Sequence, residues 1–467
     1  MLPDDAITRI VEGAQSIGQI CQSKGIAEWE IVAFQSYGHE LDIEAGKIKL
    51  AAGGGDGGYG VRVLDGGRFG YAHLVDVSGA EHAVSQAISI AKISPAIEGF
   101  CLPENQKSTE VLGRCDNRIL DVSPEDLLEQ ADAILNEVAS LDSRAVVTGG
   151  GVGVSATAGA IVTSQGILSS GISTSHGAGV QVSIDENDEL TSAWESSSSR
   201  KLLKSVPDCI ETSVHWAQCT RGPIEVDSEA VDCPVLMTSE GFTPLFSVCV
   251  PAAVKGQRLA RKESFWSGKE GQVVLANDLT LIDDGLMEGG MGSSSRDGEG
   301  VPSHTQVLVE NGRLVGSMWS TRDSAQMVAE GRIEHAQSTG SAVRGSHQSP
   351  PYTGCSDMIL KSSNGGKSRD DLISHMEDGY IVHSVMGAHT ANPTSGDFSV
   401  TTSTILKVVD GQIVGPIKQA GLSGNIAKAL TNDVILGDRP IIQDSYSTGG
   451  MHIPDVLVMN GFRINPA

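Results

Sequence analysis

Residues 400–417 read VTTSTILKVVDGQIVGPI, two runs of alternating apolar and polar side chains joined by the dipeptide Asp410-Gly411. An Asp-Gly or Asn-Gly connection of two residues favours a tight turn whose twist matches that of antiparallel strands. The stretch TQVLVENGRLVGSMWS at 305–320 has the same pattern around Asn311-Gly312. Both stretches therefore predict β-hairpins, and they predict that the second half of the chain consists mainly of antiparallel sheet.

The first half of the chain mixes alternating runs with helical patterns. Helices are indicated by apolar residues at helical spacing, by a glycine that ends one such run, and by a serine cap followed by proline. Strands are indicated by period-two alternation around Ala-Gly and Asp-Gly-Gly turns. The predicted elements are helices at 4–23, about 79–93, from Ser123 onward and about 205–219, and strands at 29–36, 39–52, 59–74 and several more between 144 and 199.

The length of 467 residues exceeds one ordinary core and predicts two domains. The best boundary is Thr220-Arg221-Gly222-Pro223, after which the pattern restarts with strand, helix and strand. We therefore expect an α+β fold in two domains. Residues 1–221 would combine helices with antiparallel strands, and residues 222–467 would form a mainly antiparallel β-sheet domain with a few helices.

Charge and composition exclude several classes of function. The 33 Lys and Arg residues against 58 Asp and Glu residues give a net charge of −25, which would repel nucleic acid and anionic membranes. The N-terminal sequence MLPDDAITRI lacks a basic segment followed by an apolar one, and no run is apolar enough to span a membrane. Eight scattered cysteines without a CxxC pair predict reduced, mostly buried thiols. We expect a soluble cytoplasmic protein that contacts neither nucleic acid nor membrane.

Several local patterns resemble functional motifs without their context. GGGDGGYG at 53–60 contains GxGxxG, but a strand follows it where a dinucleotide site needs a helix, so we expect a flexible turn between strands. The acidic pairs Asp283-Asp284 and Asp297/Glu299 are interpreted as surface acids. His383 and His389 are expected to be a strand histidine and a loop histidine.

Loops bounded by glycine or proline are where binding residues are often found. Arg344 and His347 lie in AVRGSHQSPP, Asn425 lies in LSGN, and His389 follows a Met-Gly bend. These four residues are candidates for contacting a peptide. Each of them is also compatible with an ordinary solvated loop.

The segment TPLFSVCVPAAVKG at 243–256 follows a short apolar strand, and its Thr243-Pro244 start predicts a helix. The segment contains no His, Asp or Glu. Cys249, flanked by Val248 and Val250, is expected to be a core thiol. The alternative, a nucleophilic thiolate near a helix start, would need a base that its own segment lacks.

From residue 282 onward several stretches together resemble one family, the TldD/PmbA family, whose members are called modulators of DNA gyrase. The N-terminal stretch YGVRVLDGGRFGYAHL is similar to a hairpin in the first domain of the same family. The stretches that carry the resemblance in the second half are IDDGLMEGGMGSSSRDGEGVPSHTQVLVENGRLVG, STGSAVRGSHQSPP, HTANPTSGDFS and LSGNIAKAL.

The resemblance implies a fold shared by two kinds of subunit. A TldD-type subunit carries zinc and cleaves peptides or small unfolded proteins, and a PmbA-type subunit, also called TldE, lacks the metal. In the zinc-bearing kind an HExxxH helix supplies two ligands and the general base, and a cysteine near the C-terminus supplies a third ligand. Counted from the matching flanks, these positions hold Val248, Cys249, Ala253 and Tyr446. The resemblance therefore implies a PmbA/TldE-like chain with no catalytic residues and no metal of its own.

Three hypotheses about function follow. The first is a non-catalytic subunit of a cytoplasmic protease assembly, a dimer or higher oligomer in which the zinc belongs to a TldD-like partner and the substrate is a peptide or an unfolded protein. The second is a hydrolase that acts alone and without metal, using Cys249 or a loop histidine such as His389. The third is a homodimeric binding or scaffold protein.

Overall fold

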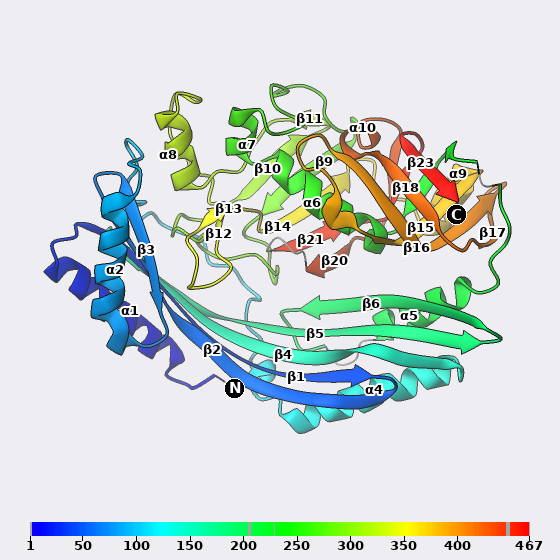
Figure 1. The fold of residues 1–467 in the computed structure, drawn as a ribbon, viewed down its shortest axis with the longest axis horizontal. Helices are drawn as coiled ribbons and strands as arrows, with labels where there is room; N and C mark the ends of the chain where they lie inside the picture. Colours follow the sequence, from blue (N-terminus) through cyan, green and yellow to red (C-terminus); the bar gives the residue numbers. More distant parts are fainter. Residues whose placement is uncertain (1, 204–206, 228, 445–448, 467) are drawn as a thin grey trace.

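The structure, a computed structural model, describes residues 2–203, 207–227, 229–444 and 449–466. The described residues form the α+β fold that the sequence predicts, with antiparallel pairing in most of its sheets (Figure 1). The N-terminal elements are α1 (Ala6–Ser23), β1 (Glu28–Glu44), β2 (Lys47–Asp65), β3 (Arg68–Leu74), η1 (Val77–Gly79), α2 (Ala80–Ile93), α3 (Asn117–Leu120), α4 (Pro124–Leu141), β4 (Ala145–Thr163), β5 (Leu168–Glu186), β6 (Glu189–Ser199) and α5 (Pro207–Cys219).

The N-terminal strands form one long, curved antiparallel sheet in the order β3-β2-β1-β4-β5-β6 (Figure 1). Ala45 (φ 50°) and Gly46 (φ 72°) join β1 to β2, and Asn187 (φ 57°) and Asp188 (φ 63°) join β5 to β6. Positive φ at two successive residues is the signature of a two-residue hairpin turn. The turn predicted from Ala-Gly is therefore confirmed.

The two faces of this sheet differ in chemistry. On one face the apolar residues Ile31 and Leu41 pack into cores that also contain residues of α1, α2 and α4. The alternate positions of β1, Ser36 and Gly38, lie opposite Thr157 and Ser155 of β4 on the other face. Around Ser36 and Gly38 the neighbours on this second face are mostly small residues, Gly54, Thr157 and Ser155 among them. The C-terminal half of the chain lies over this face (Figure 1).

The glycine-rich segment 53–60 is part of β2, so the prediction of a turn there was wrong. Every residue of the segment pairs with β1, from Gly53 opposite His39 to Gly60 opposite Val32. Glycine weakens an isolated strand, which is why the segment resembles a turn when it is considered alone. β1 supplies the pairing through its residues 32–39, which lie outside the segment and so are not part of its own pattern.

The glycines of β2 differ in the space around them, which gives a paired prediction. A Cβ at Gly60 would lie 2.0 Å from Tyr71 Oη and 2.6 Å from the carbonyl oxygen of His347, whereas a Cβ at Gly54 would have no neighbour within 4 Å. We expect Gly60→Ala to lower the free energy of unfolding by about 1–3 kcal/mol through overpacking, and Gly54→Ala to leave it nearly unchanged. Urea unfolding of both variants tests this, and equal midpoints would contradict it.

The C-terminal strands form two larger sheets and one small one. Their described orders are β11-β10-β9-β14-β21-β20, β12-β13, and β19-β22-β8-β15-β16-β18-β23-β7 with β17 beside β16. The helices are α6 (Ser239–Ala253), α7 (Gly256–Arg261), α8 (Thr321–Ala329), α9 (Arg369–Met376), η2 (Ala388–Thr390) and α10 (Ile426–Ala429). The strands are β7 (Val231–Asp232), β8 (Val235–Met237), β9 (Leu279–Asp284), β10 (Thr305–Glu310), β11 (Arg313–Leu314), β12 (Ala342–Val343), β13 (Tyr352–Thr353), β14 (Asp357–Ser362), β15 (Gly379–Met386), β16 (Asp397–Val409), β17 (Gln412–Pro416), β18 (Ala420–Asn425), β19 (Val434–Leu436), β20 (Ile441–Asp444), β21 (Gly450–Ile453), β22 (Val456–Val458) and β23 (Phe462–Pro466).

Both hairpins predicted in the second half are confirmed. Asp410 (φ 48°) and Gly411 (φ 69°) join β16 to β17, and Asn311 (φ 46°) and Gly312 (φ 77°) join β10 to β11. The neighbours β8 with β15 and β14 with β21 are parallel. The sheets are therefore mainly, but not wholly, antiparallel.

Helix α6 begins earlier than the sequence predicts. Thr238 caps it by accepting a hydrogen bond from Gly241 N (3.4 Å), so the helix does not start at Thr243. Pro244 and Pro251 lie inside the helix. A proline inside a helix removes a backbone hydrogen bond, and here the surrounding core holds the helix, because most of its residues are buried.

The two halves of the chain share a hydrophobic core. Ile210 and Val214 of α5 belong to the same buried cluster as Leu236, Ile381 and Leu406 of the large C-terminal sheet. The domain boundary at residue 221 stays a prediction. Among the described residues, no helix has both the length and the apolar composition needed to cross a membrane.

Candidate functional site

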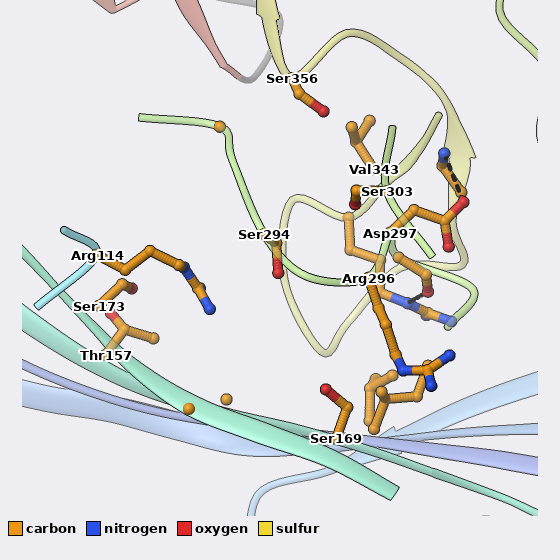
Figure 2. Close-up of a pocket in the computed structure, with 18 of the residues that line it drawn as sticks. Arg114, Thr157, Ser169, Ser173, Ser294, Arg296, Asp297, Ser303, Val343 and Ser356 are labelled. Atoms are coloured by element: carbon orange, nitrogen blue, oxygen red, sulfur yellow. Dashed lines mark hydrogen bonds between the residues drawn. The ribbon is translucent and has the colours of Figure 1, made fainter. Parts of the chain in front are cut away.

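A pocket of about 330 Å³ lies between the second face of the N-terminal sheet and loops of the C-terminal half (Figure 2). We call it the central pocket. Its floor consists mostly of small and hydroxyl-bearing residues of β1, β4 and β5, among them Phe34, Thr157, Gly159, Ser169, Gly171 and Ser173. Its roof comes from four C-terminal segments and includes Ser294, Arg296, Asp297, Ser303, Val343 and Ser356.

Asp357 fixes one roof loop of the central pocket. Its side chain is fully buried, and its oxygens accept hydrogen bonds from Met291 N and Gly292 N, each at 3.0 Å, and from Ser293 Oγ at 2.7 Å. His452 Nε2 lies 3.1 Å from Asp357 Oδ1. A buried carboxylate that accepts several backbone amides holds a loop in one conformation. The loop at 291–294 is therefore a fixed wall.

Asp283 supports the neighbouring part of the roof, although the sequence analysis places it on the surface. It is buried, and its Oδ1 accepts a hydrogen bond from Ser356 N (2.7 Å). Burial, reinforced by the nearby Asp357 carboxylate, raises the pKa of Asp283 to about 7. The interpretation of this residue as a surface acid was wrong, because β9, the strand to which it belongs, lies inside a sheet between β10 and β14.

The Asp297/Glu299 pair is also structural, which corrects a second surface interpretation. Asp297 accepts hydrogen bonds from Glu299 N and Val301 N, each at 2.9 Å, and from Ala342 N at 3.0 Å. Burial raises the pKa of Asp297 to about 7, with a further contribution from Glu299. Glu299 is fully buried and forms an ion pair with Arg62 of β2 at 3.0 Å. This acidic turn therefore attaches the roof to the floor.

Arg344 is the one candidate peptide-binding residue that lines the central pocket. Its side chain is buried, forms an ion pair with Glu30 of β1 and donates to the carbonyl oxygen of Gly298 at 2.6 Å. A guanidinium bonded in this way to its own protein has little capacity left for a ligand. Arg344 therefore holds the pocket together.

The other three candidates do not line the central pocket. His347 is buried, and its carbonyl oxygen accepts a hydrogen bond from Tyr71 Oη at 2.7 Å. His389 is exposed on η2. Asn425 caps α10 and donates to Asp397 Oδ1 at 2.8 Å. The four candidate peptide-binding residues therefore lie in different parts of the fold and have different roles.

The positions where the family resemblance implies zinc ligands lie on α6. Val248 is half-buried, and Cys249 and Ala253 are buried within the largest hydrophobic core. Tyr446 lies outside the described residues. Burial raises the pKa of the Cys249 thiol to about 11, so that it is protonated at neutral pH.

These residues do not fit a zinc ion. Zinc in proteins takes three or four nitrogen, sulfur or oxygen donors, and neither a valine nor an alanine side chain has a donor atom. Within the described part of the chain, no group of three or more His, Cys, Asp or Glu side chains is placed to hold a metal ion. The only acidic residue of α6 is Glu240, in the first turn.

Comparison with known proteins agrees with this architecture. The family description "PmbA/TldA metallopeptidase C-terminal domain" matches residues 230–464, and "PmbA/TldA metallopeptidase domain 1" matches residues 29–91. The two matched domains and the α+β fold therefore place the chain in the class of metallopeptidase-like proteins. Within that class, the chain belongs to the TldD/PmbA family.

Several relatives match most of the chain. An uncharacterized protein of Methanocaldococcus jannaschii is 27% identical over 412 residues, which cover 88% of this chain and 92% of the relative. The metalloprotease PmbA of Escherichia coli O157:H7 is 23% identical over 466 residues, which cover 97% of both chains. A metalloprotease TldD homolog of Buchnera aphidicola is 26% identical over 422 residues, 87% of this chain and 84% of the relative.

Solved structures show the same fold. The crystal structure of TldE from Thermococcus kodakarensis has a TM-score of 0.86 at 23% identity and covers 97% of this chain, with 98% of its own chain matched. That of a putative modulator of a DNA gyrase from Thermotoga maritima has a TM-score of 0.84 at 20% identity and covers 97% of this chain, with 99% of its own chain matched. At these identities the likeness establishes the fold alone.

Proposed function

We propose that this chain is a PmbA/TldE-like, non-catalytic subunit of a cytoplasmic protease assembly. In this assembly a zinc-bearing TldD-like partner cleaves peptides or small unfolded proteins, and this chain helps to enclose or present the substrate. The feature that supports the proposal is helix α6, where the family resemblance puts two zinc ligands and the general base at Val248, Cys249 and Ala253, none of which is a histidine or an acid.

The packing of α6 supports the proposal. Cys249 and Ala253 have no exposed surface, and they pack in the same core as Phe246 and Val250. A catalytic helix must present its ligands to a space that substrate and water can enter. Here the corresponding side chains fill the interior of the fold.

The same burial argues against a hydrolase that acts alone through Cys249. The thiolate is the nucleophilic form of cysteine, and burial raises the pKa of Cys249 to about 11. A lowered pKa would be needed for catalysis near neutral pH. His389, the other residue of that hypothesis, is exposed on η2 and does not line the central pocket.

The experiment compares the chain alone with the chain mixed with an HExxxH-bearing homologue. Purified alone in the presence of zinc, the chain is expected to hold far less than one zinc ion and to leave reduced, carboxymethylated lactalbumin intact. The mixture is expected to co-purify and to cleave this substrate. As a control, the homologue with its HExxxH glutamate changed to glutamine should still co-purify but should not cleave.

Two results would overturn the proposal. Cleavage by the chain alone that Cys249→Ala abolishes would establish the independent hydrolase. A stable homodimer that fails to co-purify with the homologue would establish the scaffold protein.

A further inference from the structure

Arg114 is held rigidly at the edge of the central pocket. Its carbonyl oxygen accepts a hydrogen bond from Thr174 N of β5 at 3.0 Å. The preceding residues are fixed as well, because Gly289 N of the roof donates to the carbonyl oxygen of Leu112 at 2.9 Å. From this position the Arg114 side chain extends into the pocket, beside Ser173 and Thr157 (Figure 2).

Arg114 has no anionic partner within the described part of the chain. Its side chain donates no hydrogen bond there, its buried Nε is unpaired, and no carboxylate oxygen lies within ion-pair distance. By contrast, Arg62, Arg344 and Arg369 each pair with a carboxylate. Burial lowers the pKa of Arg114, yet a guanidinium keeps its charge in a protein. A partly desolvated cation without a partner is costly unless a ligand supplies the negative charge.

The other polar groups of the pocket do not supply that charge. Of the other two arginines in the lining, Arg344 is paired with Glu30. Arg296 donates to neutral oxygens, those of Gly300 at 2.7 Å and of Asn105 at 3.0 Å. Among the described residues that line the pocket, Asp297 is the only acidic one, and three backbone amides already occupy its oxygens. The pocket is therefore electropositive in a chain whose net charge is −25.

We propose that the central pocket binds a carboxylate of an extended peptide and that Arg114 is the residue that pairs with it. A guanidinium and a carboxylate match in a bidentate geometry. The floor suits a peptide backbone, because Gly159 and Gly171 leave room for it and Ser169 and Ser173 offer hydrogen bonds. The volume of about 330 Å³ suits the end or a short stretch of a chain.

The biological meaning of this site rests on the proposed function, in which the chain presents a substrate peptide. The binding itself does not rest on that function, because it can be measured on the chain alone, without a partner and without catalysis. Failure of the partner experiment and failure of this one are therefore separate results. The carboxylate could be the C-terminal α-carboxylate or a glutamate or aspartate side chain, and the probes distinguish the two.

The experiment measures fluorescence anisotropy with three N-terminally labelled probes: Gly-Ser-Val-Ala with a free carboxylate, the same peptide as its amide, and Gly-Glu-Val-Ala amide. The wild type is expected to bind at least one carboxylate-bearing probe about tenfold or more tightly than the neutral amide, because a charge-assisted bond is lost in the amide. A preference for the first probe identifies the α-carboxylate, and a preference for the third identifies the side chain.

Two variants and one control test the role of Arg114. Arg114→Gln is expected to weaken binding of the preferred probe about tenfold or more. Gly171→Asp should do the same with the arginine retained, because a Cβ at Gly171 would lie 3.5 Å from Arg114 Nη1 and could place a carboxylate against it. Arg118→Gln removes an equal charge from an exposed residue already paired with Asp116 and should leave binding unchanged.

The unfolding midpoint of each variant establishes that it is folded. Gly171→Asp should unfold no earlier than the wild type, because it neutralises the unpaired arginine. Equal affinity of all three probes for the wild type, or undiminished binding by folded Arg114→Gln, would overturn the proposal.

Discussion

Arg62→Met is expected to lower the free energy of unfolding by roughly 3–5 kcal/mol, the range measured when one partner of a buried ion pair is removed. Arg62 of β2 lies 2.5 Å from Glu30 Oε2 and 3.0 Å from Glu299 Oε1, and all three side chains are buried. The substitution leaves Glu30 with Arg344 as its ion-pair partner and leaves buried Glu299 with none among the described residues. The cost comes from the charge left unpaired, and the intact pair need not be strongly stabilising in itself.

The position of Arg62 explains why the effect should extend across the whole fold. Glu30 and Arg62 face each other on neighbouring strands of the floor, whereas Glu299 belongs to the roof. Glu299 Oε2 also accepts a hydrogen bond from Thr321 N at 2.7 Å, at the start of α8. Removing Arg62 therefore loosens the contact between the two halves of the chain.

Urea unfolding followed by tryptophan fluorescence measures this effect. The control is Arg9→Met, which removes an exposed ion pair with Asp5 on α1 and should change the free energy of unfolding by less than about 1 kcal/mol. Equal shifts for Arg62→Met and Arg9→Met would contradict the prediction. Central-pocket binding should also weaken in Arg62→Met, because the roof and the floor are no longer fixed to each other.

Glu195→Gln is expected to remove a loss of stability that the wild type shows at alkaline pH. Glu195 of β6 lies 2.7 Å from His383 Nε2 of β15, although the two groups are not aligned as a hydrogen bond. The imidazole is stacked on Trp216 of α5 at 4.0 Å, and its Nδ1 lies 2.9 Å from Thr238 Oγ1. The pair is thus buried where the two halves of the chain meet.

The direction of the pH effect follows from the two pKa shifts. Burial raises the pKa of Glu195 to about 8 and lowers that of His383 to about 3, and nearby Arg369 opposes the first shift and adds to the second. The pair therefore holds one proton across the neutral range. Stability from Glu195 is complete below its ordinary pKa of about 4.5 and is lost as the pH rises through about 8. Stability from His383 is complete above about 6.5 and is lost as the pH falls toward 3.

The two contributions nearly cancel between about pH 4.5 and 6.5, so the loss caused by Glu195 is visible between about pH 6.5 and 8. We expect Glu195 to contribute a loss on the order of 2 kcal/mol over that interval, at 1.36 kcal/mol for each pH unit, in addition to any loss from Asp283 and Asp297, whose pKa values are also raised. Glu195→Gln should show a flatter profile, since the amide cannot ionise. Thermal midpoints at pH 6 and pH 9 test this, with Glu129→Gln on the exposed surface of α4 as control. Parallel profiles for all three proteins would contradict the prediction.

The elements that could be predicted from the sequence depend on neighbours in the chain. The hairpin turns at Asp410-Gly411 and Asn311-Gly312 need positive φ at two residues, and this requirement is visible in the residue types themselves. The start of α4 is similar, because Ser123 and Asp126 form a reciprocal capping box within four residues. The α+β fold class followed from such local patterns.

The errors arose where a distant partner decides the outcome. The segment 53–60 is a strand because every residue of it pairs with β1, and α6 continues through its prolines because the core surrounds it. Asp283 and Glu299 are buried because Ser356 and Arg62 satisfy them, and these partners lie 73 and 237 positions away. Sequence patterns of a few residues cannot contain such information.

The sequence by itself determined the fold class, the family and the absence of zinc-ligand residues on the 243–256 helix, because each of these depends on residue types and their spacing. The tertiary structure alone decided that the central pocket exists, that Arg344 is occupied by Glu30, and that Arg114, for which no local signal was recognised, lines that pocket without an ion-pair partner among the described residues. The physical reason is that burial and charge pairing are properties of neighbours in space. In this fold those neighbours come from opposite ends of the chain.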